Sequence, residues 1–151
     1  MKEVKISERL VMRLPDDYKK VPLPGLTTWV AALRSGQYAQ GKGYLNSEGG
    51  YCCLGVLCEV QLRPKYLYNV GLSRYGYDND EVGLSLRNPL CELLGDYGYF
   101  PSSVTGTLAA GDGESGSTAT ALSDLNDDGV PFSDIVTVLE LLWCEPEVAN
   151  G

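Results

Sequence analysis

The feature that most constrains the fold is a run of almost uniformly apolar residues, YCCLGVLCEV, at positions 51–60. An element that is apolar on every side has to be buried inside the protein. Periodicity alone leaves open whether this element is a helix or a strand, but its length and the single Glu59 favour a helix. We therefore predict a central buried helix over 52–62, around which the rest of the chain is organised.

The remaining helices are predicted from apolar residues at helical spacing and from residues that start or stop helices. Gly36 can end the first helix, because glycine enters the left-handed conformation without a Cβ clash. Asn88 and Pro89 suit the cap and the first turn of a later helix. The two last helices are expected to form an αα-hairpin. The predicted helices cover residues 26–35, 52–62, 88–95, 118–126 and 132–143.

We predict a mainly α fold of the α+β class, with about five short helices, a minor β-hairpin within 74–86 and long glycine-rich loops. The 151 residues are expected to form a single domain. Within it, 1–25 is an arm that includes a short strand, 105–117 is a flexible glycine-rich loop, and 145–151 is a frayed tail. The predicted core residues are Trp29, Leu33, Leu54, Leu57, Leu93, Leu122, Ile135 and Leu139.

Charge and cysteine content narrow the range of partners and compartments. A net charge of −8 argues against a nucleic-acid partner, which requires clustered Lys and Arg. No run approaches the ~18 apolar residues of a membrane span, and the charged N-terminus does not resemble a signal peptide. Five cysteines, an odd number without a CxxC pair, indicate buried free thiols. We therefore expect a cytoplasmic location and no membrane partner.

The sequence offers little for catalysis or metal binding. It contains no histidine, which excludes Ser-His-Asp and Cys-His catalysis. A calcium loop starting at Asp124 would need a glutamate at its twelfth position, where Ile135 stands. The side chains of Cys52 and Cys53 are adjacent and point apart, which is unsuitable for zinc. We predict no catalytic residues, no metal and no cofactor, although an enzyme that uses carboxylates or a metal remains an alternative.

The best candidate site is the glycine-rich segment that follows the first helix. Two cations bracket it, glycines allow backbone amides to approach an anion, and tyrosines can stack on a base. The segment lacks both the Walker motif and the dinucleotide fingerprint. An ordinary surface connection with incidental cations is the alternative. The predicted ligand-binding residues are Arg34, Ser35, Tyr38, Gln40, Gly41, Lys42, Gly43 and Tyr44.

Three motifs carry a resemblance to a known family. They are WVAALRSGQYAQGKGYL from residue 29, YCCLGVLCEV from residue 51 and LSDLNDDGVPFSDIVTVLE from residue 122. Together they resemble a small uncharacterised protein family of bacteriophage and prophage genomes. The sequence departs from that pattern at Pro131, where a capping Ser is expected, and in the long 105–117 loop. The resemblance implies a phage origin but no activity.

Phage origin and the candidate loop lead to a functional hypothesis. We expect a counter-defence protein that sequesters a cyclic nucleotide or ADP-ribose signal of a Thoeris- or CBASS-type immune system. It would act without catalysis and would form a homo-oligomer. One alternative is an acidic inhibitor or DNA mimic that binds a host defence protein, although its acidic residues are interspersed with 12 Lys and Arg. The others are an enzyme that degrades the nucleotide and a phage housekeeping protein without a ligand.

Overall fold

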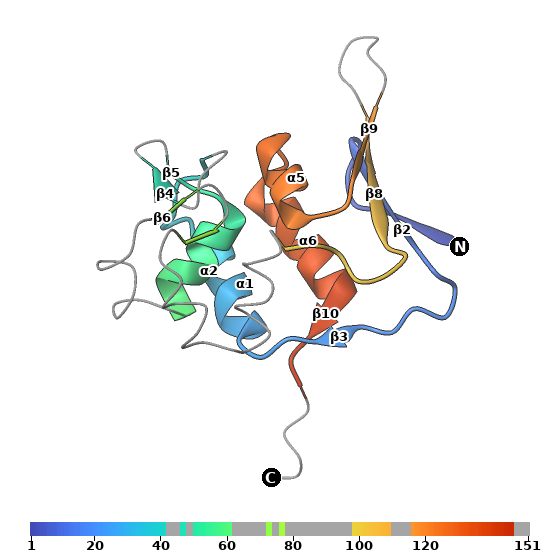
Figure 1. Cartoon of the computed structure of the whole chain (residues 1–151), viewed down its shortest axis with the longest axis horizontal. Coiled ribbons are helices and arrows are strands. Elements are labelled where there is room, and N and C mark those ends of the chain that lie inside the picture. Colours follow the sequence, from blue (N-terminus) through green and yellow to red (C-terminus); the bar gives the residue numbers. More distant parts are fainter. Residues whose placement is uncertain are drawn as a thin grey trace.

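The computed structural model describes residues 1–41, 46–47, 50–61, 72–73, 76–77, 98–109 and 116–146. Within these ranges the chain forms four helices and a four-stranded antiparallel sheet (Figure 1). The helices are α1 (Leu26–Arg34), α2 (Cys53–Gln61), α5 (Leu122–Asp127) and α6 (Phe132–Leu142). The strands of the sheet are β1 (Lys2–Lys5), β2 (Leu10–Leu14), β8 (Thr105–Leu108) and β9 (Ser117–Ala119).

The sheet has the strand order β1-β2-β8-β9 and one apolar face. Along β2 the residues Leu10, Met12 and Leu14 are fully buried, whereas Arg13 between them is exposed. This alternation follows from the two-residue period of a strand. Gly106 on β8 pairs with Met12, and a Cβ there would lie 3.1 Å from the Met12 sulfur. The glycine therefore lets the two strands pack against the core without displacing that side chain.

The prediction of a mainly helical fold with five helices was wrong. Of the described residues, 34% are helical and 27% are in strands, so the fold is α+β with a substantial sheet. Residues 105–108, which we expected in a flexible loop, form β8, and the N-terminal arm forms both β1 and β2. TGTL at 105–108 has weak β patterning, and it becomes a strand because β2 and β9 pair with it on either side.

Three of the predicted helices are confirmed, and a fourth begins later than expected. α1, α2 and α6 match 26–35, 52–62 and 132–143 to within one residue at either end. The predicted helix 118–126 is corrected, because 117–119 belongs to β9 and α5 starts only at Leu122. The predicted helix 88–95 lies outside the described residues.

Three short strand pairs complete the described structure. β3 (Val21–Pro22) pairs in parallel with β10 (Trp143–Cys144). β4 (Asn46–Ser47) pairs with β5 (Gly50–Tyr51), and β6 (Leu72–Ser73) pairs with β7 (Gly76–Tyr77), both in antiparallel orientation. β7 lies within the 74–86 region where a hairpin was predicted, but its partner β6 precedes that region. Residues 78–86 lie outside the described residues, so the predicted hairpin itself stays a prediction.

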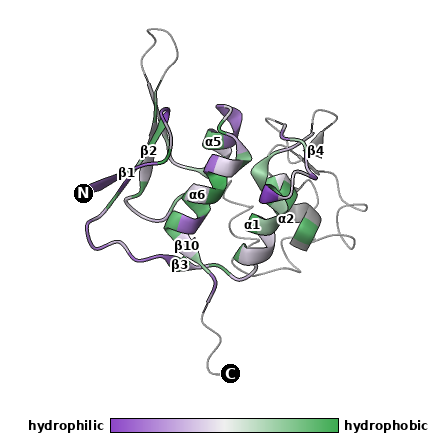
Figure 2. Cartoon of the chain, turned by 180° about the vertical axis from the view of Figure 1, so that it is seen from behind, coloured by the Kyte–Doolittle hydropathy of each residue, from purple (hydrophilic) through white to green (hydrophobic). Residues whose placement is uncertain are grey.

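The elements lie in three layers, with α5 and α6 between the sheet and the α1–α2 pair (Figure 1). The centre of the fold is thus α6, whose residues Ile135, Val138, Leu139 and Leu142 are fully buried, and not the 52–62 helix that we expected there. Every predicted core residue within the described ranges is buried; Leu93 lies outside them. Figure 2 shows hydrophobic residues on α2 and α6 and hydrophilic ones along β1 and the connection to β3.

No helix in the described part of the chain is both long and apolar enough to cross a membrane.

Candidate functional site

Arg34 is the predicted site residue that the structure places at a groove. It is the last residue of α1, and its Nη2 donates to Glu140 Oε1 of α6 at 2.7 Å. The two side chains are 57% and 50% exposed, so this ion pair is open to solvent. Ser35 is exposed, and its Oγ donates to the Ala32 carbonyl and accepts from Gln37 N–H, which closes the end of α1.

Among the described residues of the candidate loop, the backbone amide of Gly41 is already hydrogen-bonded within the protein. Gly41 N–H donates to the Tyr51 carbonyl at 2.7 Å, and Tyr51 N–H donates to the Ala39 carbonyl at 2.8 Å. A Cβ on Gly41 would lie 2.9 Å from the carbonyl carbon of Gly50, so Gly41 is needed for close contact between two backbones. Gly41 therefore serves packing, and it does not present a free amide to an anion.

The carboxamide of Asn126 on α5 joins the three motifs of the sequence resemblance. This residue is fully buried, and its Oδ1 accepts from Gln40 Nε2 at 3.0 Å and from Cys53 N–H at 3.2 Å. Its Nδ2 donates to the Gly41 carbonyl at 2.7 Å. Gln40 Nε2 also donates to the Val130 carbonyl at 2.7 Å. A buried polar group is stable only when it is hydrogen-bonded, so this cluster acts as an internal clamp between α2, α5 and the segment at Gln40–Gly41 that follows α1.

Tyr38, the aromatic residue of the predicted site that the structure describes, packs against another tyrosine of the chain. The ring of Tyr38 packs edge-on against the ring of Tyr51, with centroids 5.3 Å apart. Lys42, Gly43 and Tyr44 lie outside the described residues. The described members of the predicted set therefore divide between the α1 end, where Arg34 lies, and the Asn126 clamp, which Gln40 and Gly41 join.

The other motifs considered from the sequence have structural roles. Asp124 Oδ2 accepts from the backbone N–H of Thr120 and Ala121, which shapes the entry to α5. Cys52 precedes α2, and its Sγ accepts from Gly55 N–H at 3.3 Å, as an N-cap side chain would. Burial raises the pKa of Cys52 to about 11 and that of Cys53 well above its ordinary value. In the described part of the chain no group of His, Cys, Asp or Glu is arranged to hold a metal.

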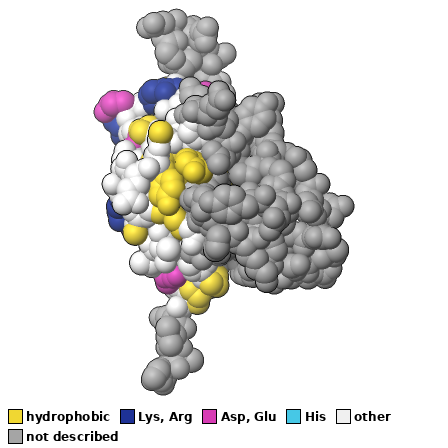
Figure 3. Space-filling model, turned by 90° about the vertical axis from the view of Figure 1, so that its left-hand side faces the viewer, with side chains coloured by type: hydrophobic (Ala, Val, Ile, Leu, Met, Phe, Trp, Pro, Cys, Tyr) yellow, Lys and Arg dark blue, Asp and Glu magenta, His cyan; other side chains and the backbone are white. Residues whose placement is uncertain are grey.

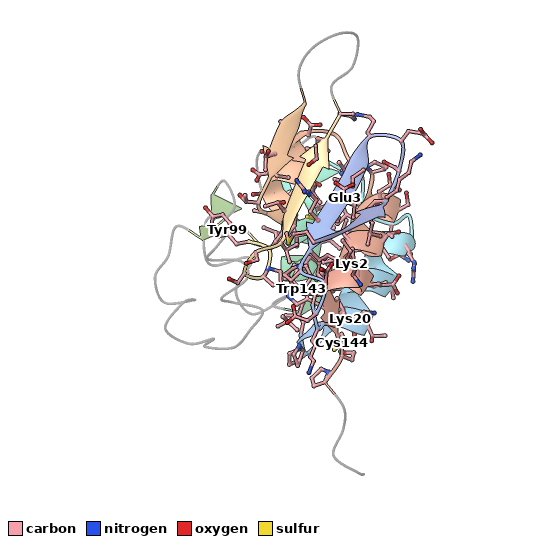
Figure 4. The ribbon with its side chains drawn as sticks, turned by 90° about the vertical axis from the view of Figure 1, so that its right-hand side faces the viewer. Lys2, Glu3, Lys20, Tyr99, Trp143 and Cys144 are labelled. Carbon is pink, nitrogen blue, oxygen red and sulfur yellow. The ribbon has the colours of Figure 1, made fainter. Side chains whose placement is uncertain are left out.

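The structure contains a groove that the sequence did not predict. It has a volume of about 460 Å³ and lies between α1, the end of α6 and the paired strands β3 and β10. Leu26, Val30 and Trp143 form an apolar floor, and each is less than a tenth exposed. The lining is Lys20, Leu26, Thr27, Val30, Ala31, Arg34, Glu140, Trp143, Cys144 and Glu145. Figure 4 shows Lys20, Trp143 and Cys144 together at this end of the molecule.

Charges are arranged at different points along the groove. Arg34 and Glu140 stand where α1 ends, whereas Glu145 Oε1 accepts from Gly25 N–H at 2.9 Å where α1 begins. Lys20 comes directly before β3, beside the junction of α6 and β10, and has no ion-pair partner among the described residues. A ligand in the groove would therefore meet two cations, two carboxylates and an apolar floor.

Tyr18 supports this junction from the side. Its hydroxyl donates to the Leu142 carbonyl, the last residue of α6. Burial, followed by the nearby Cys144 thiol, raises the pKa of Tyr18 to about 12, so the phenol keeps its proton and its hydrogen bond at neutral pH.

Sequence reasoning missed Lys20, Glu140 and Glu145 because nothing local marks them as partners. Arg34 and Glu140 are 106 positions apart, and Gly25 and Glu145 are 120 apart. The tandem Lys19-Lys20 before a proline-containing stretch was the single visible signal.

Comparison with known proteins supplies the family. No curated protein and no solved structure gave a significant match to the chain. Residues 26–142, from the start of α1 to the end of α6, match a family described as a domain of unknown function, DUF8296. The match includes all three motifs that meet at Asn126 and leaves out β1 and β2. The chain belongs to the DUF8296 family.

Proposed function

We propose that this protein is a non-catalytic binding protein that takes up a small phosphorylated ligand of nucleotide size in the groove between α1 and α6. The observation that carries the proposal is the convergence of Arg34 and Lys20, from separate segments, on an apolar floor in a groove of about 460 Å³. Small-molecule sites commonly have volumes of about 300–1,000 Å³ and combine apolar walls with a few polar groups.

Phosphate binding requires little rearrangement at Arg34. Its present partner Glu140 is half exposed, and an exposed ion pair contributes only about 0–1 kcal/mol. A phosphate could therefore replace Glu140 at a small cost and would gain a bidentate partner in the guanidinium group. Lys20 adds a second positive charge, and the floor of Leu26, Val30 and Trp143 offers a surface for a heterocycle.

The biological role that we propose is sequestration. The sequence resembles a bacteriophage and prophage family, and a phage protein that binds a host immune nucleotide tightly would silence the signal without turnover. This role suits a chain that has no histidine to serve as a general base near neutral pH. We further propose that it acts as a homo-oligomer in the host cytoplasm, which light scattering coupled to size exclusion will test.

The alternative role as an acidic DNA mimic has less support. Such a protein needs a continuous carboxylate face. On the face in Figure 3 the described acidic side chains stand apart from one another. Glu3, Glu8, Asp16, Asp128 and Glu140 each form an ion pair with a cation of the chain.

Calorimetry with a panel of cyclic nucleotides and cyclic ADP-ribose isomers tests the proposal. We expect binding to the native protein, at least tenfold weaker binding to Arg34→Ala and Lys20→Ala, and unchanged binding to Arg13→Ala. Arg13 is a matched control, because it is also a half-exposed arginine in an ion pair but lies on the outer face of the sheet. Absence of binding to every nucleotide at micromolar protein would refute the proposal, and turnover of a nucleotide would favour the enzyme alternative.

A further inference from the structure

The groove contains two carboxylates, which a site built only for phosphate would exclude. Glu140 is already engaged by Arg34 at one end. Glu145 lies at the other end, where one oxygen, Oε1, accepts from Gly25 N–H at 2.9 Å. A carboxylate has about four acceptor positions, so this bond holds the Glu145 side chain in place and leaves acceptor capacity for a ligand. Glu145 is exposed and lines the groove, so a ligand can reach it.

The length of the groove between its two ends suits a mononucleotide that lies along α1. From Leu26 to Arg34 the helix rises about 12 Å, at about 1.5 Å per residue. This length is comparable to the extent of a nucleotide from the pairing edge of its base to its phosphate. The two ends of α1, where Glu145 is bonded to Gly25 and where Arg34 stands, are therefore about one nucleotide apart along the helix axis, with Val30 and Ala31 between them.

Resting on the proposed function, we propose that Glu145 selects guanine, by accepting hydrogen bonds from the pairing edge of the base while Arg34 and Lys20 hold the phosphate. Guanine presents two adjacent donors at this edge, N1–H and the 2-amino group, which match the two oxygens of a carboxylate. Adenine presents its 6-amino donor beside the N1 lone pair, and that lone pair would face a carboxylate oxygen and repel it. A buried or partly buried acceptor that meets another acceptor loses affinity.

The other bases fit this edge less well. Cytosine, like adenine, places an acceptor next to its amino donor, and uracil places one N–H donor between two carbonyl acceptors. Hypoxanthine keeps N1–H but lacks the 2-amino group, so it supplies one of the two donors. The carboxylate therefore predicts a graded order of affinity, with guanine first, hypoxanthine second and adenine last.

The test is titration calorimetry of the full-length protein with 5′-GMP, 5′-IMP and 5′-AMP, which carry the same phosphate. We expect GMP to bind at least about tenfold more tightly than AMP, a difference of about 1.4 kcal/mol, with IMP between them. Glu145→Gln keeps an oxygen for Gly25 N–H but replaces one acceptor with an amide donor. It should weaken GMP binding and, because the new amide donor can meet adenine N1, strengthen AMP binding, so that the preference for GMP is lost. The control Glu8→Gln, on the exposed β1–β2 connection, should change neither affinity.

The outcomes separate the two proposals. Equal affinity for GMP and AMP in the native protein would overturn guanine selection while the nucleotide-binding function stands. Loss of GMP and AMP binding to the same degree in Glu145→Gln would also overturn it, because Glu145 would then act without regard to the base. Binding of none of the three would overturn both proposals. The affinity ratio in the native protein needs no variant, so the test holds even if Glu145→Gln is unstable.

Discussion

Replacement of Asn126 by alanine should destabilise the protein more than any exposed substitution. Asn126 is fully buried, and its carboxamide makes three hydrogen bonds, to Gln40, Cys53 and Gly41. Alanine would leave the buried Cys53 N–H and the Gly41 carbonyl without these partners. Gln40 would keep its bond to the Val130 carbonyl, so it contributes little to the loss.

The expected loss in the free energy of unfolding comes mainly from these two groups, which would be left without hydrogen-bond partners. A buried polar group without a partner costs about 1–3 kcal/mol, and the small cavity left by the carboxamide adds to the loss. We expect the free energy of unfolding to fall by about 3–5 kcal/mol, which is among the larger effects of single substitutions. For a domain with about 5–15 kcal/mol of stability, such a loss is severe.

The assay is equilibrium unfolding in urea followed by tryptophan fluorescence. Trp29 is a suitable probe, because its Nε1 donates to the Cys53 carbonyl at 2.9 Å, next to the clamp. The control is Asp128→Ala, two residues away on the same turn, which removes the exposed ion pair with Arg9 and should cost at most about 1 kcal/mol. If Asn126→Ala proves no more destabilising than Asp128→Ala, the clamp does not hold the three motifs together.

Three further predictions concern the same core. Gly41→Ala should lower stability by about 1–3 kcal/mol, because its Cβ would lie 2.9 Å from the Gly50 backbone; urea midpoints will measure this, and a neutral result would contradict the close packing. Trp29→Phe should cost about 1–3 kcal/mol, since it removes the hydrogen bond from the indole Nε1–H to the Cys53 carbonyl and leaves a smaller ring in a fully buried site; a thermal melt that does not shift would refute this. Stability should fall as pH rises from 9 towards 11, because the pKa of Cys52 is about 11 in the fold against 9.0 for an ordinary thiol, so the unfolded chain binds fewer protons in this window. Cys52 contributes about 3 kcal/mol to this loss for its two-unit difference, and Cys53, whose pKa is also raised, adds to it. A Cys52→Ser variant whose stability falls equally over this pH range would contradict the contribution of Cys52.

Local patterns were sufficient for the helices and for much of the core. The apolar run at 51–60 and the periodic residues of 132–143 predicted α2 and α6 to within one residue at either end. Gly36 adopts a φ of +75° directly after Ser35, as its place at the end of α1 predicted. These features depend on residues within one or two turns of each other, and a sequence displays such short-range relations directly.

The sheet could not be predicted in the same way. β8 is the short segment TGTL, whose glycine and glycine-rich continuation hid the strand preference of its two threonines. It is a strand because β2, more than 90 positions away along the chain, pairs with it and covers its inner face with Leu10 and Met12. Strand formation of this kind depends on the partner more than on the residues themselves.

The sequence by itself therefore determined α1, α2 and α6, the buried apolar residues within the described ranges, and the three family motifs. Tertiary structure alone decided what the motif residues do. It turned Gln40 and Gly41 from candidate ligand groups into partners of Asn126, and it joined Arg34, Lys20 and Glu145 in one groove. The physical reason is that hydrogen bonds and grooves form between segments that are far apart in sequence, and their partners are set only when the layers pack.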